Sequence, residues 1–294
     1  MRCLPLALAL ACSSPGARST SADTGSEAPA LDPDVRSYVP PGWRASDPVR
    51  LVYLGDSITA GAGASKGSLA YSSLLVEDTS SQWSDYADLD LQSRYGVLEV
   101  IDVSRGGATT SSLLTQQLPA LDDVVGGSAL GETLVVMTVG GNDVRYALNP
   151  LESAEAILDK VVRNIEEAVL DLQRRFPDGA YIYLTNVYEP TDGVGQWGGC
   201  FWGMDFSDRL PVLYAGEEDL YAMGERLGVA VIDLRGHFMG HGFHHRDTAL
   251  EAHHPEDPTL WFAGDCIHPN DRGHHEIRRL LHAAISGVDL PRAR

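Results

Sequence analysis

The sequence predicts a single domain built on a parallel, doubly wound α/β sheet. Three observations support this fold class: apolar runs recur from Val49 onward, helical patterns lie between them, and most of the runs do not alternate with polar residues. Non-alternating runs are typical of strands covered on both faces. Strands that alternate with helices favour parallel pairing, because each crossover helix returns the chain to the same end of the sheet.

Five segments have the composition of buried strands, being dense in β-branched and aromatic residues. They are 49–55, 97–104, 133–140, 180–187 and 229–234. In doubly wound sheets, ligands bind beyond the carboxyl ends of the strands. Polar residues that directly follow these runs are therefore candidates for a functional site.

Two helices are marked by their ends and by an apolar stripe at helical spacing. The first is predicted over 150–176, where Asn149 can cap the helix and Pro150 fits its first turn. The second is predicted to follow Asn270 and to end at Gly287.

The N-terminus predicts export. Residues 1–12 combine a positive end at Arg2 with a short apolar stretch, 4–11, which is too short to span a bilayer. The stretch resembles a bacterial lipoprotein signal in which Cys12 is lipidated, although Ala9 stands where such signals usually have leucine. We expect a lipoprotein of the periplasm, outer membrane or cell surface, with a freely secreted protein as the alternative.

Composition separates a tether from the folded domain. Residues 13–47 are rich in Ser, Ala, Pro, Gly and Asp and predict a flexible low-complexity tether, so the domain is expected over 48–294. The chain has 41 acidic and 22 basic residues, a net charge of −19. Such a charge repels phosphate backbones and disfavours a nucleic-acid partner. Contact with a membrane is expected only through the N-terminal anchor.

Four short segments carry chemically versatile residues. The segments 55–57, 104–110 and 140–143 directly follow strands, and 265–271 precedes the last helix. Together they bring a hydroxyl, backbone N–H groups, a side-chain amide, a carboxylate and an imidazole to one rim of the sheet. That set of groups is what acyl transfer requires.

Each of these groups has a role in a serine hydrolase. The Ser57 hydroxyl is a weak nucleophile that needs a neighbouring base, and His268 can be that base. Asp265 can hold the imidazole in the correct tautomer and stabilise its cation. The backbone N–H groups of Ser57 and Gly107 and the amide of Asn142 can donate to the oxyanion of a tetrahedral intermediate.

The sequence leaves two alternatives open. Asp271 and His274 repeat the spacing of Asp265 and His268. We prefer the earlier pair because it lies in an irregular loop, whereas Asp271 is expected to cap the last helix and His274 to lie within it. Gly106 can also replace its neighbour as the backbone donor.

The four segments, in this order, resemble the SGNH hydrolases of the GDSL esterase/lipase family. The matching blocks span residues 51–275 and read GDSIT, SRGGATT, GGND and DCIH, with Ile58 where the family name has leucine. The resemblance implies a flavodoxin-like three-layer α/β/α sandwich with a five-stranded parallel sheet. It implies ester hydrolysis without a metal or other cofactor, and an oxyanion hole of Ser57, Gly107 and Asn142.

We therefore expect a serine ester hydrolase that acts on a lipid ester, an acetylated polysaccharide or a small acyl ester. A thioesterase or acyltransferase would use the same residues. A non-catalytic, carbohydrate-binding surface lipoprotein is disfavoured because the full set of catalytic residues is present. An ordinary α/β-hydrolase is disfavoured because Thr59 stands where its nucleophile elbow has glycine.

Cysteine and histidine suggest two further features. After removal of the export signal, the remaining cysteines are Cys12, Cys200 and Cys266. In an exported protein, the last two are expected to form one disulfide bond. All ten histidines lie between residues 237 and 282, but those of the loop 237–254 lack clean ligand spacing, so we predict no metal.

Five aromatic residues fall in two long insertions near the predicted rim: Trp197, Phe201, Trp202, Trp261 and Phe262. They can line an acyl or sugar pocket. They can equally hold the insertions against the body of the domain, and the sequence does not decide between these roles.

Overall fold

A computed structural model describes residues 36–83, 86, 88–127, 129–148, 153–197 and 203–288. The export signal with Cys12, the beginning of the tether, and Cys200 lie outside the described residues. Within the described ranges, no helix has both the length and the apolar character needed to span a bilayer.

A five-stranded parallel sheet forms the centre of the domain, as the sequence predicts. Its strands are β1 (Arg50–Gly55), β2 (Glu99–Asp102), β3 (Thr133–Thr138), β4 (Ala180–Thr185) and β5 (Ala230–Ile232). They lie in the order β2-β1-β3-β4-β5, and every neighbouring pair is parallel. The order reverses between β1 and β3, which is the place where doubly wound sheets bind ligands.

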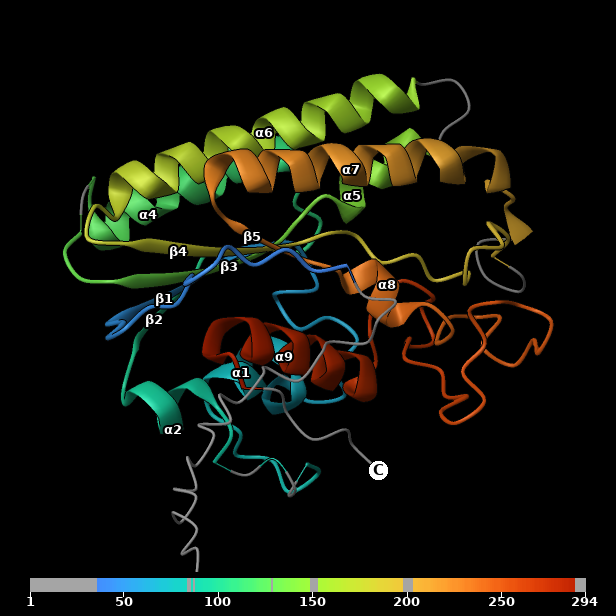
Figure 1. Cartoon of the computed structure of the whole chain (residues 1–294), viewed down its shortest axis with the longest axis horizontal. Helices are drawn as coiled ribbons and strands as arrows, with labels where there is room; N and C mark the ends of the chain where they lie inside the picture. The colour runs from blue at the N-terminus through green and yellow to red at the C-terminus, as the bar shows by residue number, and fades with distance from the viewer. Residues whose placement is uncertain are drawn as a thin grey trace, which may run out of the picture.

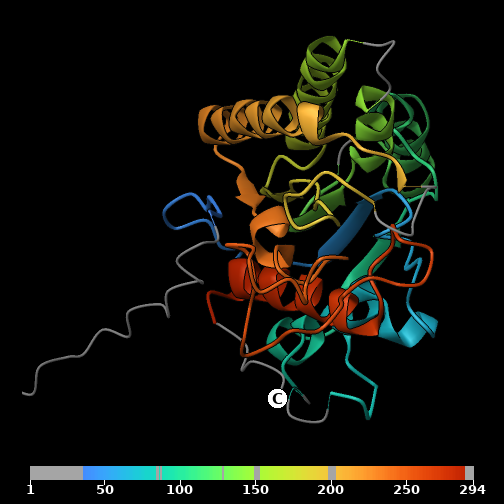
Figure 2. The ribbon, with the colours of Figure 1, turned by 90° about the vertical axis from the view of Figure 1, so that its right-hand side faces the viewer.

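Helices cover both faces of the sheet and complete a three-layer α/β/α sandwich (Figure 1). One face carries α4 (Leu118–Val125), α6 (Ala154–Arg175) and α7 (Leu210–Leu227), and the other carries α1 (Tyr71–Val76) and α9 (Asp271–Ser286). Figure 2 turns the molecule by a quarter and shows the same layers, with α6 and α7 above the sheet and α9 below it. The shorter elements are η1 (Gly67–Leu69), α2 (Leu91–Tyr95), α3 (Thr110–Ser112), the π-helical turn η3 (Leu113–Gln117), α5 (Gly141–Ala147), η5 (Ser207–Arg209) and α8 (Leu234–Phe238).

Successive strand residues point into two different apolar cores. Val135 of β3 lies in the core that contains Leu172 of α6, whereas Leu134 lies in the core that contains Leu281 of α9. All four side chains are fully buried. Burying one such side chain contributes about 1.5–3 kcal/mol, so both faces of the sheet stabilise the fold.

The edge strand β2 differs from the expectation that every strand is covered on both faces. Glu99, Val100 and Asp102 are exposed and only Ile101 is buried, whereas β3 is buried throughout. The expectation is wrong for β2, which lies at the margin of the sheet with a neighbour on one side only. At the other margin, β5 is buried and its free side is bridged by Tyr38.

The two predicted helices are present, with one corrected start. The first begins at Ala154, because the Ser153 hydroxyl caps it by accepting a hydrogen bond from the N–H of Ala156 at 3.2 Å. Asn149 and Pro150, which were expected to form its start, lie outside the described residues. The last helix follows Asn270 and ends before Gly287, as predicted.

The last part of the expected tether packs on the domain. Tyr38 forms an antiparallel bridge with Val231 of β5, with N···O distances of 2.8 Å in both directions. The Trp43 ring lies 5.2 Å from the ring of Tyr181, and Ala45 is buried. Residues 36–47 therefore belong to the folded body, because their aromatic side chains have apolar surface to cover.

Candidate active site

Ser57 stands at the carboxyl end of β1, at the rim of the sheet. Gly55, the last residue of β1, has a φ of 142°, and a Cβ atom at this position would lie 2.2 Å from the carbonyl oxygen of Thr138. Asp56 then turns the chain, since its carboxylate accepts a hydrogen bond from the N–H of Ile58 at 2.9 Å. Glycine is thus required where β1 and β3 approach each other, and the turn leaves Ser57 half-buried.

The structure brings His268 to Ser57 across 211 residues of sequence. The imidazole Nε2 lies 2.8 Å from the Ser57 hydroxyl, and Nδ1 lies 2.6 Å from a carboxylate oxygen of Asp265. A carboxylate can only accept, so Nδ1 carries the hydrogen and Nε2 is free to accept the hydroxyl proton. This arrangement is that of a serine nucleophile, its base and the group that orients the base.

The loop that carries His268 is held by its own hydrogen bonds. The second carboxylate oxygen of Asp265 accepts from the N–H groups of Ile267 and His268 at 3.1 and 3.0 Å. Partial burial acts to raise the pKa of Asp265, but the hydrogen bonds from His268 and Ile267 outweigh it and hold the pKa below its usual value. Asp265 is therefore ionised whenever the imidazole must be oriented.

Two candidate oxyanion donors lie on neighbouring segments. Gly107 has a φ of 77° and lies in a turn that is closed by a 3.0 Å hydrogen bond from the Ala108 N–H to the Arg105 carbonyl. The Gly107 N–H takes no part in that bond. The Asn142 amide donates to the Ala108 carbonyl at 2.9 Å, so one of its two hydrogens joins the segments and the other remains available.

A buried carboxylate fixes these two segments relative to each other. Asp143 accepts from both the N–H and the hydroxyl of Thr110, each at 2.9 Å. Gly106 lies against the nucleophile, since a Cβ atom added there would be 4.0 Å from Cβ of Ser57. The turn with both glycines is thus anchored beside Ser57.

The alternative pair, Asp271 and His274, serves other purposes. The expectation that Asp271 caps the last helix is wrong, because Asn270 is the cap. The Asp271 carboxylate instead accepts hydrogen bonds from the N–H and the hydroxyl of Ser65. His274 is fully buried within the helix, with Nε2 at 2.9 Å from the Ala62 carbonyl. Neither residue contacts Ser57 through any hydrogen bond that the structure describes.

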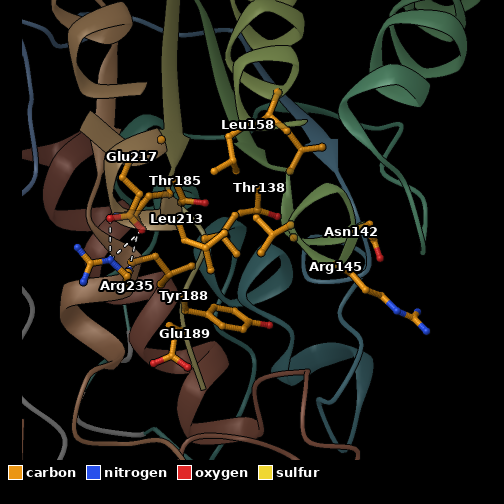
Figure 3. A pocket seen from close by; sticks show the side chains of 18 of the residues that line it. Thr138, Asn142, Arg145, Leu158, Thr185, Tyr188, Glu189, Leu213, Glu217 and Arg235 are labelled. Carbon is orange, nitrogen blue, oxygen red and sulfur yellow. Dashed lines mark hydrogen bonds and ion pairs between the residues drawn. The ribbon is translucent and has the colours of Figure 1, made fainter. Parts of the chain in front are cut away.

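A cavity of about 570 Å³ opens beside Ser57. It lies between α5, α6, α7 and the carboxyl ends of β3 and β4, and its lining includes Val144, Leu158, Val161, Ile165, Leu213 and Leu220. In Figure 3, Asn142 and Arg145 stand on one side of this cavity and Glu217 and Arg235 on the opposite side, with Thr138 and Leu213 between them. The volume is within the range of roughly 300–1,000 Å³ that is usual for ligand pockets.

The aromatic residues divide between the two roles that the sequence left open. Trp197 lines the cavity, whereas Trp261 and Phe262 are buried against Phe238 and do not line it. Phe201 and Trp202 lie outside the described residues.

In the histidine-rich loop, His241 is buried, whereas residues 246–249 are exposed. The His241 ring stacks on Trp261, with ring centroids 3.5 Å apart, and burial lowers the pKa of His241 to about 4. Within the described ranges, no group of three or more His, Cys, Asp or Glu side chains is arranged to hold a metal ion.

Two features of the site escaped sequence reasoning. Tyr188, which follows β4, lines the cavity and donates its hydroxyl to the Ile267 carbonyl at 2.6 Å. The helix α7 presents Leu213, Gly216 and Leu220 to the cavity. Their i, i+3, i+7 spacing was a readable signal for an amphipathic helix, but it did not indicate that a cavity lay beneath.

Comparison with known proteins identifies the family to which the chain is similar. The model of the GDSL-like lipase/acylhydrolase family matches residues 53–276, and no curated protein matches the sequence. An acetylxylan esterase from Geobacillus stearothermophilus has a similar structure, with a TM-score of 0.53 and 18% identity over 84% of this chain and 98% of its own. Phospholipase A1 from Streptomyces albidoflavus NA297 also has a TM-score of 0.53, with 20% identity over 81% of this chain and 99% of its own. At such identities the two structures share the fold with this chain.

Proposed function

The chain belongs to the GDSL-like lipase/acylhydrolase family and is a carboxylic ester hydrolase, and we propose that Ser57, His268 and Asp265 are its catalytic triad. One observation carries the proposal. The His268 ring bridges the other two groups, with 2.8 Å from Nε2 to the Ser57 hydroxyl and 2.6 Å from Nδ1 to Asp265. Both distances are within hydrogen-bond range, as general base catalysis requires.

The reaction proceeds through an acyl-enzyme. The Ser57 oxygen attacks the ester carbonyl carbon while His268 Nε2 takes the hydroxyl proton. The tetrahedral intermediate then breaks its bond to the alcohol oxygen, which leaves with the proton from His268. A water molecule attacks the acyl-serine ester, again giving its proton to His268, and the acid is released as Ser57 recovers its hydrogen.

In the tetrahedral intermediate the carbonyl oxygen carries a negative charge, and we assign the N–H groups of Ser57 and Gly107 and the Asn142 amide as its donors. The hydrogen bond from Asn142 to Ala108 supports this set, because it holds the side-chain amide beside the turn that carries Gly107. One such donor typically stabilises the transition state by about 3–4 kcal/mol.

Labelling with a fluorophosphonate tests the assignment of the nucleophile. The probe should form one adduct per chain, on the peptide that contains Ser57, and Ser57→Ala should abolish both labelling and hydrolysis of p-nitrophenyl esters. Ser73→Ala on α1 is a matched control that should retain both. An adduct on another serine, or an active Ser57→Ala protein, would contradict the triad.

We also propose that the enzyme is exported and anchored through lipidated Cys12. The proposal rests on the sequence of residues 1–12 alone. Expression of the full chain in a bacterium should place it in the membrane fraction, and Cys12→Ser should release it. A full chain recovered only from the cytosol would contradict export.

A further inference from the structure

The cavity beside Ser57 has walls that suit a hydrocarbon chain. On α6, Leu158, Val161 and Ile165 follow the i, i+3, i+7 pattern and face the cavity. On α7, which packs beside α6, Leu213 and Leu220 also face the cavity. A ligand that removes this apolar surface from water gains about 0.8 kcal/mol for each buried methylene group, which is about fourfold in kcat/KM.

Several polar side chains of the cavity wall are paired with the protein. Both carboxylate oxygens of Glu217 accept from Arg235 Nε, at 2.8 and 2.6 Å. The side-chain amide of Asn186 donates a hydrogen bond to the Asp233 carboxylate at 2.8 Å. The amide oxygen of Asn186 accepts one from the backbone N–H of Arg235 at 2.9 Å. A sugar has many hydroxyl groups that need partners, and these wall residues have their partners already.

Glu189, which also lines the cavity, is engaged in the same way. Its carboxylate accepts from the N–H and hydroxyl of Thr191 and from the N–H of Gly193. The cavity therefore offers contact area and little hydrogen bonding. It is also far larger than an acetyl group requires.

The cavity opens at the reacting groups. Its lining includes Ser57, Asn142 and Ile267, the residue before His268. In Figure 3 the Leu158 and Leu213 side chains lie between Asn142, on one side, and the paired Glu217 and Arg235, on the other. A chain attached to the carbonyl carbon at Ser57 can thus extend past the two leucines toward the ion pair.

From these observations we infer that the cavity binds the acyl chain of the ester, and that the substrates are esters of medium or long aliphatic acids rather than acetylated carbohydrates. The inference rests on the proposed function, because it takes Ser57 as the point to which the acyl group is attached. Leu158 and Leu213 then determine chain-length specificity.

Kinetics with p-nitrophenyl acetate, butyrate, octanoate and decanoate test the substrate class. The value of kcat/KM should rise at least tenfold from acetate to octanoate. Acetate as the best substrate of the series would overturn the inference, while leaving the serine mechanism intact.

A tryptophan at position 158 tests the assignment of the cavity. Leu158→Trp should fill it and lower the octanoate-to-acetate ratio of kcat/KM at least tenfold. Val124→Trp is the matched control, since Val124 is an exposed residue of α4 outside the cavity, and its ratio should equal that of the wild type. An unchanged ratio in Leu158→Trp would overturn the inference.

Binding without turnover separates the cavity from the chemistry and does not depend on whether Leu158→Trp folds. Titration calorimetry with decanoate on the Ser57→Ala protein should show one site, and xylose should show none. If decanoate does not bind, the acyl-chain inference fails even if Ser57 proves to be the nucleophile. If decanoate binds but the fluorophosphonate labels another serine of the wild-type protein, the proposed mechanism fails while the assignment of the cavity as an acyl-chain site is retained.

Discussion

The Tyr188 hydroxyl donates a 2.6 Å hydrogen bond to the carbonyl oxygen of Ile267, the residue immediately before His268. Tyr188 also stacks on Phe238, with ring centroids 5.2 Å apart, and lines the cavity. One side chain thus joins the wall of the cavity to the loop that carries His268. Tyr188 is therefore a positioning residue in our interpretation.

Tyr188→Phe should lower kcat about two- to tenfold with little change in KM for p-nitrophenyl acetate. The ring and its packing remain, and the loss is one neutral hydrogen bond of about 0.5–1.5 kcal/mol. Steady-state kinetics and thermal unfolding should be measured together. The exposed Tyr146 of α5 offers a control in Tyr146→Phe, and equal effects in both variants would exclude a positioning role.

The three triad residues should behave as a unit. Ser57→Ala and His268→Ala should each lower kcat by about 10⁴–10⁶-fold, and the double variant should be no worse than either. Asp265→Asn should be milder but still severe, because it disturbs the tautomer of the base. Single-turnover assays on folded protein measure this. A dispensable His268 would mean that another residue is the base.

Asn142→Ala should lower kcat by about 10²–10³-fold and leave KM within a few-fold, since the oxyanion exists only in the transition state and the intermediate. The change also removes the hydrogen bond to Ala108, so the melting temperature must be recorded. A loss confined to KM would show that Asn142 binds the ground state instead.

Acid should destabilise the fold through His274. Both nitrogens of its neutral ring form hydrogen bonds. Nε2 donates to the Ala62 carbonyl at 2.9 Å, and Nδ1 accepts from the Tyr71 N–H at 3.3 Å. Burial lowers the pKa of His274 to about 4, whereas an unfolded histidine has a pKa of about 6.5. The unfolded chain therefore takes up the proton first. Protonation of His274 therefore does not change the free energy of unfolding above about pH 6.5, and this free energy falls as the pH falls from there to about 4.

The loss expected from His274 alone is about 3 kcal/mol. Urea unfolding of the wild type and of His274→Gln between pH 8 and pH 4 measures it. The variant should be less stable at pH 8 but show a shallower decline toward acid. Parallel curves for the two proteins would contradict this assignment.

The predicted bridge between Cys200 and Cys266 remains a prediction, since Cys200 lies outside the described residues. Cys266 packs against the cluster of Trp197, Phe206 and Leu210, close in sequence to Cys200. A bridge would close a loop of about 65 residues and stabilise the fold by on the order of 4 kcal/mol in the chain-entropy model. Mild reduction should lower activity before the sheet unfolds. Peptide mapping of non-reduced protein should recover the linked peptides, and two alkylatable thiols would contradict the bridge.

Much of the site was readable because three of its chemical groups follow strands of the sheet. Ser57, Gly107 and Asn142 come after β1, β2 and β3, and parallel strands bring their carboxyl ends to one edge whatever the lengths of the intervening helices. Two Asp–His pairs have the same spacing, and only the expected start of the last helix favoured Asp265 and His268 over Asp271 and His274. The structure bears out that start, although Asn270 rather than Asp271 is the cap.

The sequence by itself determined the fold class, the order of strands and helices, and the identity of the residues that can perform acyl transfer, because these depend on local apolar periodicity and on residue chemistry. Only the tertiary structure decided how those groups meet and what surrounds them. The 2.8 Å contact between His268 and Ser57, the burial of His274, the hydrogen bond from Tyr188 to Ile267 and the cavity between α6 and α7 all depend on how distant segments pack. Periodicity marks which face of a helix is apolar, but whether that face meets a side chain or a space is set by the volumes of residues far away in sequence.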